Sequence, residues 1–323
     1  MIKIGMIGIN NGNGHPYSYS SIFNGFNPEL IDLCPFDVIK EYLVDIHKNE
    51  HIISNAKVTH IWTQDLTISK KIAAFSNIPN IVNDLDDLLN KVDAVILARD
   101  DVENHFDLAK KFIKNGTPIF IDKLITDNFL SLNDLLELKN KSKTKIMATS
   151  SSRFTPNILN AKMKLNQLDV KYVHGVSRVN WFRYANHLLD GLTYLFGTDF
   201  ESIQNISKNS ELDIMHIVYK NNLECVLTVQ KDLALPISLT LYAKEEQIEV
   251  PFTDKNFSSY FFGFYNMLND FVDYVRTGNS ISKFEDSIKN TCLIILGNIS
   301  KTQNNRKVFF DELEKSPIYK YIK

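Results

Sequence analysis

The first residues suited to binding chemistry form a turn rich in glycine and asparagine, Gly8-Ile-Asn-Asn-Gly-Asn-Gly-His15, directly after an apolar segment. Glycines in such a turn let backbone N–H groups approach a diphosphate, and the following helix directs its positive end there. The pattern is not a complete G-x-G-x-x-G, because Asn10 occupies the second glycine position, but asparagine tolerates unusual φ angles. We expect a dinucleotide at this turn, held by Gly8, Asn10, Asn11, Gly12, Gly14 and His15.

A second cofactor contact is expected where the next strand ends, in the run Ile61-Trp-Thr-Gln-Asp65. NAD-binding proteins place an acid at this point to hold the ribose hydroxyls, whereas an arginine accommodates the 2′-phosphate of NADP. Thr63 stands at the acid's position and Asp65 comes two residues later, with no arginine nearby. The sequence predicts a contact from Thr63 and leaves the choice between NAD and NADP open.

The elements around this turn alternate between strand and helix. Four short apolar runs, at residues 2–9, 58–62, 94–98 and 119–121, have the continuous hydrophobicity of strands buried on both faces. Residues 103–114 place their apolar side chains on one helical face, and Asn115-Gly116 ends that helix. Strand, helix and strand joined by short connections predict the parallel sheet of a Rossmann domain.

The connection between the first helix, at about residues 17–23, and the second strand is unusually long. It runs over residues 24–57 and contains an apolar-patterned stretch at 35–43 that begins with proline, a residue favoured in the first turn of a helix. We expect this insertion to form a short helix in a flap near the cofactor or the substrate.

The pattern changes after about residue 124. Short β-rich runs follow one another without intervening helices, which predicts an antiparallel sheet; they cover residues 171–180, 212–220, 223–231, 237–244 and 247–252. Two amphipathic helices then close the chain. We therefore expect an α/β domain over residues 1–124, with a Rossmann parallel sheet, and an α+β domain over 125–323, with a large, open-faced and mainly antiparallel sheet.

Composition excludes several classes of protein. The net charge of −2, with both signs mixed along the chain, gives no basic face for nucleic acid or an anionic membrane. No apolar stretch approaches the ~20 residues needed to cross a bilayer. The three cysteines have no CxxC spacing, so neither a zinc site nor a disulfide framework is indicated, and a reduced, cytoplasmic setting is expected.

Several motifs occur in the order and spacing of one known family. They lie at residues 92–98, His105, 115–123, Arg153-Phe154, 187–197 and 307–311. Together they resemble the Gfo/Idh/MocA oxidoreductases, which include glucose-fructose oxidoreductase and inositol dehydrogenase. The resemblance covers nearly the whole chain and implies NAD(P)-dependent chemistry on a sugar or cyclitol.

The family carries an E-K-P signature at the domain crossover, with a lysine that touches both cofactor and substrate. The matching residues here are Asp122-Lys123-Leu124, so the resemblance implies that Lys123 is a catalytic and cofactor-contacting residue. Proline is replaced by Leu124, which makes a cis peptide bond at that point unfavourable by ~3 kcal/mol. Further cofactor contacts are expected from Arg99, Asp100, His105 and Asp122.

The family's second signature, D-x-x-x-H on a helix, matches Arg183-Tyr-Ala-Asn-His187. The resemblance implies that His187 is catalytic, and Asp190, three residues on, shares its helix face and could orient the imidazole. Arginine replaces the acid, and a guanidinium only donates hydrogen bonds, which favours an anionic substrate such as a uronate, keto acid or sugar nucleotide. The predicted substrate contacts are Arg153, Arg183, Tyr184 and Asp190.

These residues predict oxidation of an alcohol, or the reverse reaction, with Lys123 holding the reacting hydroxyl and His187 taking its proton. Two alternatives stay open, because the superfamily contains NAD-dependent glycosidases and a corepressor that binds dinucleotide without turnover. We also expect a carbohydrate-like substrate, no metal, and a homodimer or homotetramer, since open-faced sheets of this kind often pair between subunits.

Overall fold

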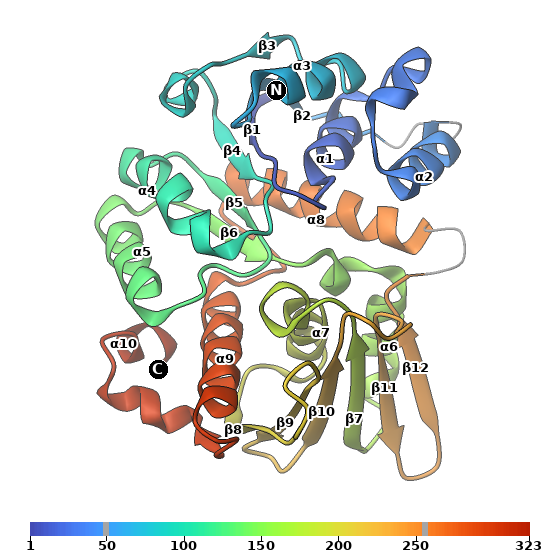
Figure 1. Ribbon diagram of the computed structural model, residues 1–323, viewed down its shortest axis with the longest axis vertical. Coiled ribbons are helices and arrows are strands. Elements are labelled where there is room, and N and C mark those ends of the chain that lie inside the picture. The colour runs from blue at the N-terminus through green and yellow to red at the C-terminus, as the bar shows by residue number, and fades with distance from the viewer. Residues whose placement is uncertain (48–51, 254–257) are drawn as a thin grey trace.

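The computed structural model describes residues 1–47, 52–253 and 258–323, and this part of the chain contains two β-sheets (Figure 1). The first sheet has six strands and lies in the N-terminal half of the chain. The second has seven strands and lies in the C-terminal half. The predicted combination of a parallel and a mainly antiparallel sheet is confirmed.

The first sheet has the strand order β3-β2-β1-β4-β5-β6, with every pair parallel. This is the order of a Rossmann domain. The strands at residues 94–97 and 119–122 are apolar and buried along their whole length, as the continuous hydrophobic runs predicted. The strands are β1 (Ile2–Ile7), β2 (Ala56–Trp62), β3 (Asn80–Ile81), β4 (Ala94–Leu97), β5 (Ile119–Asp122) and β6 (Ile146–Thr149).

The helices of this domain connect its parallel strands. The helix predicted at 103–114 is α4 (His105–Asn115), and it ends at Gly116, whose φ of 77° is the left-handed conformation that glycine adopts without strain. The others are α1 (His15–Asn24), α3 (Leu66–Phe75) and α5 (Phe129–Ser142).

The domain boundary predicted at residue 124 is too early. Both α5 and β6 follow that residue, and β6 pairs with β5 in the first sheet. In addition, α8 (Ser258–Thr277) returns from the second half of the chain to pack on the first domain (Figure 1). The ring centre of Phe271 on α8 lies 5.8 Å from that of Phe120 on β5. An apolar stripe distant in sequence therefore completes the N-terminal core, which no local pattern could indicate.

The insertion at 24–57 forms a short 3-10 helix (Pro28–Leu33) and α2 (Asp37–His47), which confirms the helix predicted there; residues 48–51 lie outside the described chain. Tyr42 of α2 donates a hydrogen bond of 2.5 Å to the Ser18 hydroxyl of α1. The insertion is thereby fixed beside the first helix.

The second sheet has the order β12-β11-β7-β10-β9-β8-β13 and is antiparallel except for the β7–β10 pair. Its strands are β7 (Val170–Ser177), β8 (Phe200–Asn205), β9 (Asp213–Tyr219), β10 (Glu224–Val229), β11 (Ser238–Ala243), β12 (Gln247–Pro251) and β13 (Val308–Phe309). The strands were expected to follow one another directly, but α7 (Trp181–Phe196) separates β7 from β8.

Helices cover one face of the second sheet. Leu188 of α7 lies over Gly175 of β7, and α9 (Phe284–Thr302) packs against both α7 and β8. The indole of Trp181 donates a 2.8 Å hydrogen bond to the Ile294 carbonyl, which joins the two helices. Along β7, β9 and β10 the alternate residues, on the opposite face, are only half-buried. The smaller helices here are α6 (Pro156–Leu165) and α10 (Tyr319–Ile322).

Candidate active site

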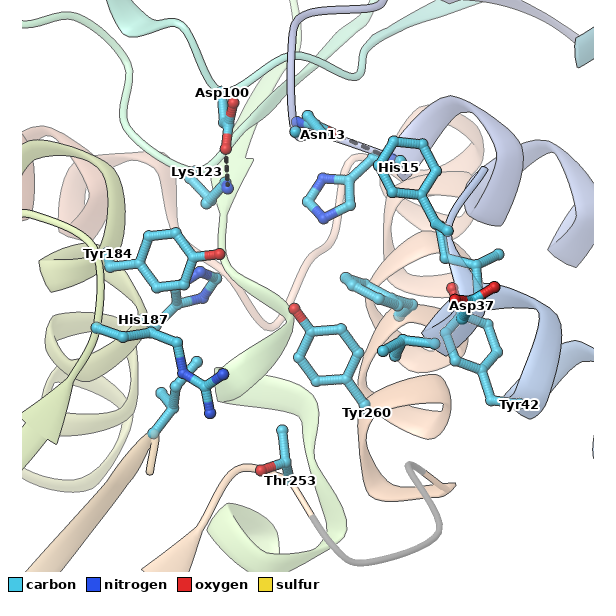
Figure 2. A pocket seen from close by; sticks show the side chains of 18 of the residues that line it. Asn13, His15, Asp37, Tyr42, Asp100, Lys123, Tyr184, His187, Thr253 and Tyr260 are labelled. Atoms are coloured by element: carbon cyan, nitrogen blue, oxygen red, sulfur yellow. Dashed lines mark hydrogen bonds and ion pairs between the residues drawn. The ribbon is translucent and has the colours of Figure 1, made fainter. Parts of the chain in front are cut away.

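A cavity of about 540 Å³ lies where the start of α1, the helix α2, the end of β5 and the helices α7 and α8 meet. We call it the interdomain cavity. Its volume is within the range of small-molecule sites. Its lining comes from residues 12–15, 35–39, Tyr42, Asp100, Lys123, Arg178, Tyr184, His187, Ile237, Thr253, Tyr260 and Phe264 (Figure 2).

The glycine-rich turn borders this cavity, and the structure requires glycine at three of its positions for different steric or backbone reasons. A Cβ at Gly8 would lie 2.4 Å from the ring of Pro16, so only glycine lets α1 begin so close to β1. Gly12 has a φ of 80° and open space where a Cβ would be, so its backbone can be approached closely. A Cβ at Gly14 would lie 2.4 Å from Ile39 and 2.7 Å from Phe36, so the insertion can pack on the turn only where residue 14 has no side chain.

This turn fits the diphosphate of a dinucleotide. The N–H groups of Asn11 and Gly12 have no hydrogen-bond partner among the described residues. The first N–H of α1, at His15, already donates to the side-chain oxygen of Asn13 at 2.7 Å, and Pro16, the next residue, has no N–H group. Anion contacts would therefore come from the turn's backbone more than from the helix itself.

Thr63 does not offer its hydroxyl to a ribose. That hydroxyl donates to the Asp65 carbonyl at 2.6 Å and lies 2.8 Å from the Ser69 hydroxyl, while the Asp65 carboxylate caps α3. The predicted contact from Thr63 is contradicted, because short-range hydrogen bonds in the turn before α3 use its polar atoms.

Arg99 is similarly occupied. Its guanidinium donates to the Ile9 carbonyl at 3.0 Å and to Gln64 at 2.9 Å, and it forms an ion pair with Asp101. It therefore ties the end of β1 to the end of β2 rather than projecting freely toward a cofactor.

Lys123 follows β5 with a φ of 63°, and its side chain turns into the interdomain cavity. Its ammonium lies 3.3 Å from the Asp100 carboxylate and 5.6 Å from the centre of the Tyr184 ring (Figure 2). Burial alone would lower the pKa of Lys123, but the charges of Asp122 and Asp100 outweigh it and raise the pKa above its usual value. Lys123 is therefore a cation at neutral pH.

Asp100 joins the turn, Lys123 and α7. It accepts hydrogen bonds of 2.5 Å from both Asn10 and Arg183, and its own N–H donates to the Asn10 amide oxygen at 3.0 Å. Burial would raise the pKa of Asp100, but the neighbouring Lys123 ammonium and these donors lower it well below its usual value. Asn10 thus supports the site through Asp100.

Arg183 lies on α7, but its side chain does not reach the substrate site predicted for it. Besides its ion pair with Asp100, it lines a separate hollow with Trp181 and Lys301 and does not line the interdomain cavity. The exposed guanidinium that does line the cavity belongs to Arg178, five residues earlier, which has no ion pair within the described chain.

His187 lines the cavity as predicted, with its ring edge-on to Tyr184 at 5.1 Å. Its Nδ1 is 2.6 Å from the hydroxyl of Ser150. Burial and the nearby Lys123 charge lower the pKa of His187 to about 3, so the imidazole is neutral at physiological pH.

Asp190 and Arg153 do not face a substrate, which corrects two predicted contacts. Asp190 is 1% exposed and accepts hydrogen bonds from Thr149 at 2.9 Å and Asn290 at 3.0 Å. Arg153, also 1% exposed, lies 3.4 Å from Asp190 and 3.2 Å from Asp286 of α9. Asp190 is one helical turn from His187 but points into the core, where it ties β6 to α7 and α9.

Two other predicted cofactor residues have internal partners. His105 is 1% exposed, and its ring nitrogens lie 2.8 Å from the Leu124 carbonyl and 3.1 Å from the Arg99 carbonyl. Asp122 is also 1% exposed and lies 2.5 Å from Nδ1 of His15. His105 therefore supports the two loops at the sheet's edge, and Asp122 acts on the cavity through His15 and through its charge near Lys123.

Some cavity residues had no signal specific enough to identify them. Tyr260 and Phe264 are four residues apart on α8, a spacing that indicates an apolar core face as readily as a cavity wall. Phe36 and Tyr42 come from the insertion, whose flap position was predicted but not its side chains.

Fold and site together define a class: a dinucleotide-binding Rossmann domain joined to an open-faced sheet domain, with a cavity between them that has aromatic walls and a few convergent polar groups. The family described as "Oxidoreductase family, NAD-binding Rossmann fold", Gfo/Idh/MocA, matches residues 40–150. Residues 40–150 are therefore similar to the NAD-binding domain of the Gfo/Idh/MocA oxidoreductases, in agreement with the resemblance found in the sequence.

Solved structures share this fold over nearly the whole chain. Scyllo-inositol dehydrogenase from Lactobacillus casei superposes with a TM-score of 0.74 at 14% identity, covering 96% of this chain and 98% of that one. Myo-inositol dehydrogenase from the same organism, solved with NAD(H) and myo-inositol, gives 0.73 at 14% identity, covering 96% and 97%. An oxidoreductase from Agrobacterium radiobacter, solved with NAD+, L-tartaric acid and magnesium, gives 0.73 at 11% identity, covering 97% and 99%. No curated protein matches the chain in sequence.

No described helix has the length and apolar character required to span a bilayer. Within the described residues, no group of three or more His, Cys, Asp or Glu side chains is placed to hold a metal ion.

Proposed function

We propose that this protein is an NAD-dependent oxidoreductase that interconverts a hydroxyl and a carbonyl group on a sugar, cyclitol or related polyol. The observation that carries the proposal is the position of Lys123. This buried cation lies at the carboxyl edge of a Rossmann sheet and faces a cavity shared with Tyr184 and His187 of the second domain.

The cavity suits a hydroxyl-bearing ring. Aromatic side chains supply apolar walls, while Lys123, His187 and Asp100 offer convergent polar groups. When bound, a nicotinamide dinucleotide supplies or accepts the hydride; the free N–H groups at Asn11 and Gly12 would hold its diphosphate. NAD is favoured over NADP because Arg99, the cation beside Gln64 at the end of β2, is already paired with Asp101.

Lys123 would hold the reacting oxygen and stabilise it as it becomes negative. Its ammonium is held in the cavity by the buried ion pair with Asp100, at 3.3 Å. His187 would donate or accept a hydrogen bond at a second substrate oxygen. Its low pKa means that it stays neutral while doing so.

The test is to measure binding of NAD and NADP to the purified protein, and then turnover with a panel of cyclitols, sugars and sugar acids. Reduction of NAD by a member of this panel supports the proposal. Tight NAD binding with no turnover across the panel would indicate a nucleotide-binding sensor, and glycoside cleavage without net NADH would indicate a hydrolase.

We also propose that the chain forms a homo-oligomer through the uncovered face of the second sheet. Tyr172 of β7 and Tyr242 of β11 lie together there, with ring centres 5.6 Å apart, and Val218 of β9 is half-buried on the same sheet. Light scattering tests this: a dimer or tetramer is expected, and a monomer at micromolar concentration would contradict it.

A further inference from the structure

Two imidazoles reach the interdomain cavity from facing sides (Figure 2). His15 begins α1 in the Rossmann domain, and His187 lies on α7 in the second domain. The Nδ1 atom of each ring has a partner, but the partners differ. His15 meets the Asp122 carboxylate at 2.5 Å, and His187 meets the Ser150 hydroxyl at 2.6 Å.

The carboxylate partner fixes how His15 carries its proton. Burial would raise the pKa of Asp122, but the Lys123 ammonium and the hydrogen bond from His15 lower it below its usual value, so Asp122 is ionised and can only accept. The proton of a neutral His15 must then be on Nδ1. This leaves the Nε2 lone pair, on the far side of the ring from Asp122, available to a ligand in the cavity.

Packing holds the His15 ring in this orientation. The ring stacks on Tyr19 at 4.7 Å and meets the edge of Phe264 at 5.2 Å. The Tyr19 hydroxyl also donates to the second oxygen of Asp122 at 3.4 Å, and the Asn13 amide lies 3.5 Å from the first. A carboxylate, an imidazole and a cavity are therefore aligned in that order.

His187 is less suited to taking a proton. A serine hydroxyl can donate or accept, so Ser150 offers no fixed charge to stabilise an imidazolium. The adjacent Lys123 ammonium further opposes a positive charge on the ring. A general base works best when its protonated form is accessible near the working pH, which His187 does not provide.

We propose that His15, held by Asp122 as its positioning residue, exchanges the proton with the substrate hydroxyl in the interdomain cavity. The inference rests on the proposed oxidoreductase function. In the oxidative direction the substrate O–H bond breaks, its electron pair stays on the oxygen, and the proton forms an N–H bond to Nε2 of His15. The resulting imidazolium faces the Asp122 carboxylate, and His187 remains a neutral hydrogen-bonding group.

The deciding experiment reads the proton position directly, in full-length protein labelled with nitrogen-15 histidine and without added nucleotide. The neutral His15 ring should be protonated on Nδ1. Asp122→Asn, whose amide can donate to Nδ1, should shift the ring toward the Nε2–H form, and Asp122→Glu should restore the original form. His15→Asn assigns the resonances. A wild-type His15 protonated on Nε2, or a tautomer unaffected by Asp122→Asn, would overturn the proposal.

Kinetics provide the second readout, with NAD and the polyol that the substrate panel identifies. His15→Asn should lower kcat by ~10²–10⁴-fold with a smaller effect on KM, whereas His187→Asn should act mainly on KM. The reverse pattern would overturn the assignment of His15. Absence of turnover by the wild type contradicts the oxidoreductase function instead, and the nitrogen-15 spectra still decide whether the Asp122–His15 pair has the inferred proton arrangement.

Discussion

Two clusters of buried charge meet helix α7, and only one of them opens into the cavity. Asp100, Lys123 and Arg183 form the first, at the junction of the Rossmann sheet with the second domain. Asp190 and Arg153, which are buried, form the second with the half-buried Asp286, away from the cavity. A buried charge pair therefore does not by itself indicate a functional site. What distinguishes the first cluster is that Lys123 and Asp100 line a cavity large enough for a ligand.

The largest expected effect comes from breaking the cavity cluster. Lys123→Ala should reduce kcat/KM by at least ~10²-fold, because the reacting oxygen loses its cationic partner. The unfolding free energy should change much less, since Asp100 keeps its bonds to Arg183 and Asn10. Lys110→Ala, which removes an exposed ammonium on α4, is the matched control. Full turnover in Lys123→Ala would remove this lysine from the mechanism.

Breaking the interior cluster should instead reduce stability and leave activity nearly unchanged. Arg153→Met leaves the carboxylates of Asp190 and Asp286 without their cation and should cost about 3 kcal/mol of stability, measured by urea unfolding. The kcat of the folded protein should stay close to that of the wild type. Arg276→Met, at an exposed ion pair on α8, should change stability little. A stable Arg153→Met protein that had lost activity would contradict the division between the two clusters.

Stability should depend on pH through the buried His187, which lies beside the cavity cluster. His187 has a pKa of about 3 in the folded protein and 6.5 when unperturbed, so below pH 6.5 the unfolded chain binds a proton that the folded chain does not. Stability should therefore fall as pH drops through this window, by about 1 kcal/mol per pH unit from this group. His187→Gln should have a shallower slope between about pH 6 and pH 4.5. Equal slopes in the two proteins would show that His187 is charged when folded.

The two arginines near α7 provide the smallest expected difference. Arg178→Met should raise the KM for a carboxylated polyol roughly tenfold and leave the KM for a neutral polyol unchanged, because a hydrogen bond between charged groups contributes about 1.5 kcal/mol. Arg183→Met, whose guanidinium is bound to Asp100, should not discriminate between the two substrates. If only Arg183→Met raised the KM for the carboxylated polyol and not that for the neutral one, Arg183 would be the substrate contact that the sequence predicted.

Much of the fold could be predicted because it depends on local patterns. Continuous apolar runs identified β1, β2, β4 and β5 but not β3 and β6, and the Asn115-Gly116 stop signal identified the end of α4. The return of α8 to the first domain could not be predicted, since its apolar stripe would suit any core. Residue types alone predicted a site at the glycine-rich turn, and the family resemblance predicted Lys123 and His187; the structure brings part of the turn and both side chains to one cavity.

The remaining site residues were assigned by spacing, and spacing does not determine direction. Asp190 follows His187 by three residues, yet His187 faces the cavity and Asp190 accepts hydrogen bonds in the core. Arg183 stands at the position of the family's acid, but its guanidinium reaches Asp100 on the other domain. The pairing of His15 with Asp122, 107 residues apart, depends on how α1 meets the end of β5. Only the folded chain shows such side-chain directions and long-range contacts.

The most direct test of the account is a crystal structure of the full chain grown with NAD. We expect a diphosphate against the backbone of Asn11 and Gly12, and a nicotinamide ring in the interdomain cavity beside Lys123, between His15 and His187. Nucleotide bound elsewhere, or a nicotinamide ring outside this cavity, would contradict it.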